Sequence, residues 1–205
     1  MKKALVIILL LIIGLAGFVW FKFKTDKKVD FNGDKAVEIR ADKHSAAFNA
    51  SIDSMMAAYF SMKSAFVEAD TVGIKAGAAK MIVLADSIHI DEIKKDTTGI
   101  YETVVTFLND VKSNTQSLLT QTKLEEMRLD FKQVNEQLYS FLKSVNYEGK
   151  KLYWQVCPMA FNDTESANWV SDSKDIINPY LGKKHPKYHA EMLECGEVVD
   201  SIQAK

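Results

Sequence analysis

Residues 122–145 read TKLEEMRLDFKQVNEQLYSFLKSV, and this stretch decides the fold. Its large apolar side chains recur at alternating spacings of three and four, at Leu124, Met127, Phe131, Val134, Leu138, Phe141 and Val145. That period puts them on one face of an α-helix and leaves the charged residues on the other. Thr122 and Glu125 have the spacing of a capping box, which predicts where the helix begins. We therefore predict a long amphipathic helix with Leu138 in the core.

Three earlier stretches carry stripes of the same kind. The stripes are Phe48, Ile52, Met55, Tyr59, Met62 and Phe66, then Ile74, Ala78, Met81, Ala85 and Ile88, then Ile100, Val104, Phe107, Val111 and Leu118. Within the second, Ala76, Gly77 and Ala79 make the helix slim enough for close packing. Four amphipathic helices with short polar connections can bury every apolar face together. The pattern predicts a mainly α protein built on an antiparallel up-and-down four-helix bundle.

The N-terminus has a different composition. Lys2 and Lys3 precede an apolar run from Ala4 to Phe21 that contains no charge. A helix of about 18 residues rises roughly 27 Å, close to the thickness of the hydrocarbon core. We predict a transmembrane anchor over residues 1–21, with a cleaved export signal as the alternative. The mixed charges of residues 22–43 indicate a linker, which leaves residues 44–205 as the working domain.

Charge and motifs narrow the classes of function. The formal net charge of the chain is -1, so there is no strongly basic surface for nucleic acid. The sequence has no glycine-rich phosphate loop, no G-x-S-x-G elbow and no H-E-x-x-H helix. No nucleophile and base are spaced for catalysis, and we expect a protein that is not an enzyme.

The helical spacing stops after Tyr147. Leu152–Val156 is an aromatic, β-prone run that leads to Cys157, and Trp169–Val170 is a second short apolar segment. Turn signals occur at Asn162–Asp163 and Asn178–Tyr180. We expect a small irregular C-terminal tail with short β-strands.

Both cysteines of the protein fall in this tail, and each has a methionine close by. Met159 follows Cys157 by two residues, and Met192 precedes Cys195 by three. Pro186 and Gly196 act as helix-start and helix-stop signals, which would put Met192, Cys195 and the nearby His189 on one face. Two thiolates and two thioethers form a soft ligand set, which suits Cu(I) better than Zn(II).

A disulfide is the competing interpretation. In an extracytoplasmic domain, Cys157 and Cys195 can form a bridge across their 38-residue separation. The neighbouring methionines favour the metal, but spacing alone leaves both interpretations open. His185 and His189 also have i,i+4 spacing, although a pair on a lysine-rich loop is more often incidental.

The tail also carries a set of short motifs. These are Tyr153–Asn162 (YWQVCPMAFN), Trp169–Ser171 (WVS), Ile177–Tyr180 (INPY), Gly182, and Met192–Val198 (MLECGEV). They resemble an uncharacterised bacterial domain-of-unknown-function family with the signature C-P-M-A-F-N, W-L-S, N-P-Y and M-x-x-C-G. Members of that family occur as stand-alone envelope proteins and fused to periplasmic adaptor subunits of heavy-metal (copper/silver) efflux pumps.

The resemblance implies a periplasmic domain that takes part in copper handling, with a heavy-metal efflux adaptor as a partner. Cys157, Met159, Met192 and Cys195 match its signature. The chain departs from the pattern in one place, because it inserts Lys183–Glu191, with both histidines, before the last motif.

Overall fold

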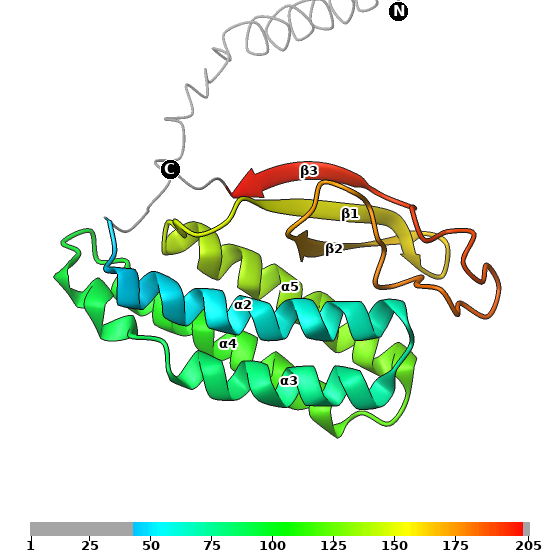
Figure 1. Ribbon diagram of the computed structural model, residues 1–205, viewed down its shortest axis with the longest axis horizontal. Helices are drawn as coiled ribbons and strands as arrows, with labels where there is room; N and C mark the ends of the chain where they lie inside the picture. Colours follow the sequence, from blue (N-terminus) through cyan, green and yellow to red (C-terminus); the bar gives the residue numbers. More distant parts are fainter. Residues whose placement is uncertain (1–42, 203–205) are drawn as a thin grey trace, which may run out of the picture. The chain divides into compact units, whose positions relative to one another are not determined.

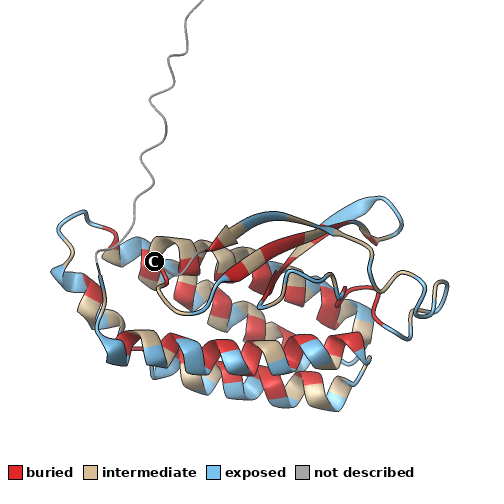
Figure 2. Cartoon of the chain, turned by 45° about the horizontal axis from the view of Figure 1, so that its top comes forward, coloured by how far each residue is buried: buried red, intermediate tan, exposed pale blue. Residues whose placement is uncertain are grey.

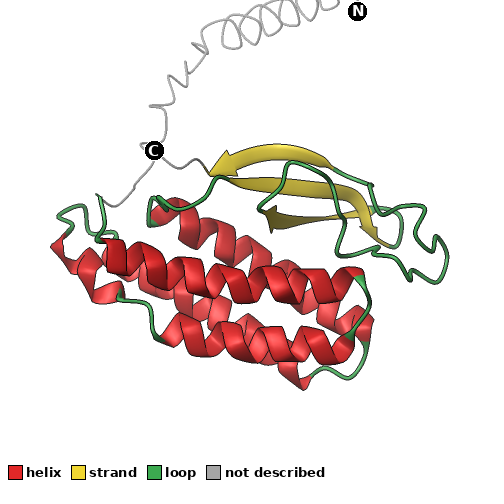
Figure 3. Cartoon of the chain, in the orientation of Figure 1, coloured by secondary structure: helices red, strands yellow, loops and turns green. Residues whose placement is uncertain are grey.

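The structure is a computed structural model that describes residues 43–202 of the 205-residue chain. Its helices are α2 (Ala46–Val67), α3 (Thr71–Asp86), α4 (Tyr101–Thr120) and α5 (Leu124–Ser144), with a short 3-10 helix, η1 (Ile90–Lys95), after α3. The strands are β1 (Leu152–Phe161), β2 (Glu165–Ser171) and β3 (Glu197–Ile202). Figures 1 and 3 show the helices side by side, with the sheet covering one side of them. The domain is therefore mainly helical with a small C-terminal sheet.

Side chains cap the starts of α2 and α3 but not those of α4 and α5. The Ser45 hydroxyl accepts from the Phe48 N–H at 3.1 Å, and the Asp70 carboxylate accepts from two N–H groups at the start of α3. The capping box at Thr122 is wrong. Helix α5 begins one residue later than predicted, Lys123 is its N-cap, and no side chain caps it. Thr122 thus lies one position too early to reach the third N–H of the helix.

The apolar stripes make the core (Figure 2). Every residue of the first two stripes is buried, and in the fourth only Leu124, at the helix start, is partly exposed. Leu138 is fully buried, as predicted. In the third stripe Ile100, Val104, Val111 and Leu118 are buried as predicted, whereas Phe107 is only partly buried and its neighbour Leu108 is buried instead. Thr115 continues that stripe, and its hydroxyl donates to the Val111 carbonyl at 2.7 Å, which makes burial of the hydroxyl tolerable.

The helices pack in chain order, α2 on α3, α3 on α4 and α4 on α5, so the predicted helical bundle is confirmed. Gly77 permits the close approach of α3 to α2. A Cβ at this position would lie 2.8 Å from the Met62 Cβ and 2.9 Å from the Met62 backbone. Opposite this contact, Phe66 of α2 stacks on Phe131 of α5 with ring centroids 4.4 Å apart.

The sheet has the order β2-β1-β3 and is antiparallel, which makes β2 an edge strand beside the helices. Side chains close the free edge of β2. The Val170 N–H lies 3.0 Å from the Tyr59 hydroxyl and 3.2 Å from the Asn135 Oδ1. The Tyr180 hydroxyl donates to the Asn168 carbonyl at 2.5 Å. An open edge would expose these backbone groups, and here α2, α5 and the C-terminal segment satisfy them.

The tail contains more strand than its sequence predicted. Strand β1 does not stop at Cys157 but continues to Phe161, and β3 was not expected. The helix predicted between Pro186 and Gly196 is absent, and this segment consists of turns. The chain must leave it in an extended form to pair β3 with β1, so Pro186 and Gly196 bracket a loop. Asn162 and Asp163 have positive φ values in the β1–β2 turn, as predicted for turn residues.

The predicted anchor over residues 1–21 and nearly all of the predicted linker lie outside the described residues. Among the helices of residues 43–202, none combines the length and the apolar composition that a bilayer span requires.

Candidate thiol site

The two cysteines meet. The Cys157 Sγ on β1 lies 3.1 Å from the Sγ of Cys195, which is two residues before the start of β3. Cys157 is fully buried, Cys195 is partly exposed, and both are free thiols. The structure therefore joins two sulfurs that are 38 residues apart in the chain, at the level where β3 leaves its loop to pair with β1.

Gly196 makes this meeting sterically feasible. It has a φ of +144°, and a Cβ there would lie 2.5 Å from the Val156 carbonyl oxygen and 3.0 Å from the Trp169 ring. Val156 directly precedes Cys157, so the missing side chain lets the Cys195 segment approach β1 beside the first thiol. The sequence suggested a helix stop at Gly196, whereas the structure requires glycine for close backbone approach and positive φ.

Asn178 holds the loop that carries Cys195. Its Nδ2 donates to the Cys195 carbonyl at 2.8 Å, and its backbone N–H donates to the Leu193 carbonyl at 2.8 Å. Its Oδ1 accepts from the N–H groups of Tyr180 and Leu181 at 2.8 and 3.0 Å. The side chain is fully buried. Sequence reasoning assigned Asn178 to a turn, but its partners show that it fixes the second thiol.

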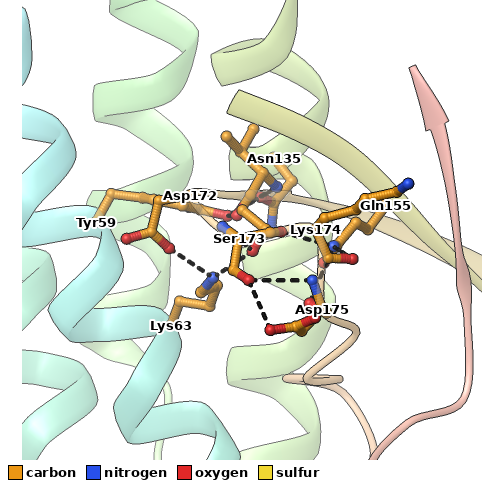
Figure 4. A network of polar contacts seen from close by, with 10 residues as sticks. Tyr59, Lys63, Asn135, Gln155, Asp172, Ser173, Lys174 and Asp175 are labelled. Atoms are coloured by element: carbon orange, nitrogen blue, oxygen red, sulfur yellow. Dashed lines mark hydrogen bonds and ion pairs between the residues drawn. The ribbon is translucent and has the colours of Figure 1, made fainter. Parts of the chain in front are cut away.

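A second polar cluster holds the loop after β2, which leads to Asn178 (Figure 4). Gln155 of β1 directs its Nε2 at the carbonyls of residues 173–175, at 3.0 to 3.2 Å. The buried Lys63 ammonium donates to the Ser171 hydroxyl at 3.1 Å and lies 3.7 Å from the Asp172 carboxylate. Sequence reasoning missed Lys63, because a lysine next to an apolar stripe is normally solvated.

The environment keeps the Cys195 thiol protonated. Burial, followed by the hydrogen bond with Cys157, raises the pKa of Cys195 to about 12. Thiolates are the nucleophilic and metal-binding form, so Cys195 is a poor nucleophile at neutral pH. A metal ion that binds here has to displace protons.

The other predicted ligands make no hydrogen bond to the thiols among the described residues. Met159 and Met192 are both partly buried and pack against the core, and the Cys195 N–H donates to the Met192 carbonyl at 3.1 Å. Within residues 43–202, no hydrogen bond joins either methionine sulfur to a thiol. His189 is exposed, and its backbone N–H bonds to the His185 carbonyl at 2.8 Å. The His189 ring makes no hydrogen bond to either thiol in the described part of the chain.

In the same part of the chain, no three His, Cys, Asp or Glu side chains gather in an arrangement that could hold a metal ion. The thiol site brings together the sulfur atoms of Cys157 and Cys195.

Comparison with known proteins adds one finding. A DUF3347 domain, described as a protein of unknown function, is found over residues 55–150. This match covers most of the bundle and ends before Cys157, so the DUF3347 match does not include the thiol motifs. The chain matches no curated protein and no solved structure.

Proposed function

We propose that this protein is a non-catalytic envelope protein that binds a soft metal ion, such as Cu(I), at Cys157 and Cys195 and assists metal efflux or homeostasis. The observation that carries the proposal is the approach of the two free thiols to 3.1 Å. Thiolate sulfur is the donor that Cu(I) prefers.

The donor set favours Cu(I) over Zn(II). A structural zinc site is almost always tetrahedral with four ligands, whereas Cu(I) accepts fewer and softer donors. Met159 and Met192 are each within three residues of a cysteine and would add thioether sulfur. His189, on the exposed loop before Met192, is a further candidate donor.

The proposed location and partner rest on the sequence. The apolar residues 4–21 would hold the domain at a membrane, or export it, with the thiol site in the periplasm. The resemblance of the Cys157 and Cys195 motifs to domains fused to heavy-metal efflux adaptors supports such an adaptor as the partner.

A competition titration tests the proposal. Reduced, anaerobic protein should take Cu(I) from a chromogenic Cu(I) chelator, and Cys157→Ser should abolish this binding. Met159→Leu with Met192→Leu should weaken binding while the fold is kept, because Leu and Met differ little in volume. The matched control is Met55→Leu with Met81→Leu, two fully buried bundle methionines, which should leave binding unchanged. Equal binding by the wild type and Cys157→Ser would refute the metal site.

The same thiol contact supports a second candidate, a structural or protein-interaction module closed by a Cys157–Cys195 disulfide. A disulfide bond is about 2.05 Å long, so the sulfurs would move together by about 1 Å. Two protons and two electrons would pass to an external disulfide oxidant. Such a bridge would tie the entry of β3 to β1.

Mass spectrometry separates the two candidates. Protein isolated from the envelope without reductant, with free thiols blocked at lysis, should carry two blocking groups if the thiols serve a metal. A mass about two units below that of the reduced chain, with no blocking group, would establish the disulfide instead.

A further inference from the structure

A cavity of about 290 Å³ lies between the first turns of α5, the end of β1 and the loop around His185. Its walls include Arg128 of α5, together with the apolar side chains of Leu129, Phe161 and Pro186. Nothing in the thiol chemistry uses this cavity. Its volume lies just below the usual range for small-molecule sites, which starts at about 300 Å³, so only a small ligand fits.

The guanidinium of Arg128 is the unusual group in this wall. Arg128 is only 5% exposed. Its Nε and Nη2 atoms are buried and have no hydrogen-bond partner among the described residues. Arginine remains protonated in proteins, so among the described residues no hydrogen bond offsets the cost of burying Nε and Nη2 of this cation. Burial lowers the pKa of Arg128, and the negative charge of Glu125 partly opposes this effect.

The two unpartnered nitrogens belong to one edge of the guanidinium. Nε and Nη2 point their N–H groups in the same direction, and this edge binds the two oxygens of a carboxylate in a bidentate manner. The missing partner is therefore best matched by a planar oxyanion.

The rest of the wall restricts which oxyanion fits. Glu125 also lines the cavity, and its negative charge opposes a second negative charge on the ligand, whereas the carboxylate of Glu165, which lines it too, is paired with Lys132 at 2.6 Å. The apolar wall favours a ligand that has a hydrocarbon part. A monoanionic carboxylate with a small apolar group meets both conditions better than a phosphate does.

We propose that this cavity is a binding site for a small apolar carboxylate, held by the Nε–Nη2 edge of Arg128. This site is separate from the thiol site and does not depend on metal binding.

Benzoate is the probe, with neutral benzamide and inorganic phosphate as comparisons. The full-length chain in a non-ionic detergent is labelled with ¹⁵N, and binding is followed by chemical-shift changes. Benzoate should bind saturably at millimolar concentration and shift the amides of Arg128, Phe161 and His185. Benzamide and phosphate should bind much more weakly. Equal binding of benzamide and benzoate, or no benzoate binding, would overturn the proposal without recourse to any variant.

Variants then assign the binding to Arg128. Arg128→Gln should weaken benzoate binding at least about tenfold. Arg128→Lys keeps the positive charge but loses the bidentate edge. Its benzoate affinity should therefore lie between that of the wild type and that of Arg128→Gln. Lys63→Gln, which removes a buried cation outside this cavity, and Cys157→Ser should both bind benzoate like the wild type. Unchanged benzoate affinity in folded Arg128→Gln would show that the guanidinium is not the receptor.

Discussion

At the scale of single residues, Asn178 ties the turn at Tyr180 and Leu181 to the loop that carries Cys195. Its one side chain serves the Cys195 carbonyl on one side and two backbone N–H groups on the other. The sequence identified the two cysteines as a pair, because thiols in one small tail are natural partners. It could not identify Asn178, because the Cys195 carbonyl that it binds is 17 residues away.

Asn178→Ala should lower the free energy of unfolding by about 1–3 kcal/mol, because buried backbone groups lose their partner. It should also speed alkylation of Cys195, since its carbonyl is no longer held. Denaturant unfolding and timed alkylation with mass detection measure the two effects. Asn109→Ala, an exposed change on α4, is the control and should alter neither. If the alkylation rate of Asn178→Ala matches the wild type, Asn178 does not position the thiol.

At the scale of elements, the spacing of apolar residues along the chain predicted the four helices well. The bounds of the strands depend instead on pairing between segments that are far apart in the sequence. One position of the stripe in α4 was assigned to the wrong neighbour, because Phe107 and Leu108 are both apolar and a spacing of three or four fits either of them. Strand β3 was not predicted, because its sequence, EVVDSI, is half polar and its partner β1 is distant in the sequence. Arg128 was missed for a similar reason, since the C-terminal segment covers it.

The contact between α2 and α3 gives a prediction at this scale. Gly77→Ala should lower the free energy of unfolding by about 1–3 kcal/mol, because its Cβ would overlap Met62. This loss should exceed the gain of up to about 1 kcal/mol in helix propensity.

Ala79→Gly, on an exposed position of the same helix, is the matched control. It should cost about 1 kcal/mol through propensity alone. Urea unfolding compares the two variants. If Gly77→Ala stabilises the protein, the two helices are not packed as closely as the structure has them.

At the scale of the whole molecule, buried weak acids give the domain a characteristic response to pH. Burial raises the pKa of Cys195 to about 12 and raises the pKa of Tyr59 and Tyr180 above the ordinary value. Below the ordinary pKa values, folded and unfolded chains hold these protons equally. Above them, only the folded chain holds the protons, so its stability falls as pH rises. Burial lowers the pKa of Lys63, so the folded chain releases this proton at a lower pH than the unfolded chain and Lys63 makes stability rise with pH.

Reduced protein should therefore keep a constant urea midpoint from about pH 7 to 8 and lose stability above about pH 9 to 10. The slope approaches about 1.4 kcal/mol per pH unit for each acid that remains protonated only when folded. Tyr59→Phe should have a shallower slope at lower overall stability. Free tyrosine ionises at about pH 10 to 11. If the urea midpoint stays constant or rises up to about pH 11, the folded chain does not hold the protons of Cys195, Tyr59 and Tyr180 more tightly than the unfolded chain.

The central claim is that Cys157 and Cys195 jointly bind a soft metal ion, and X-ray absorption at the copper edge tests it most directly. Reduced full-length protein is loaded with one equivalent of Cu(I) and freed of unbound metal before measurement. The account predicts retained Cu(I) with a first shell of sulfur alone, and loss of the metal in Cys195→Ser. A first shell of nitrogen or oxygen, or copper that Cys195→Ser retains unchanged, would contradict it.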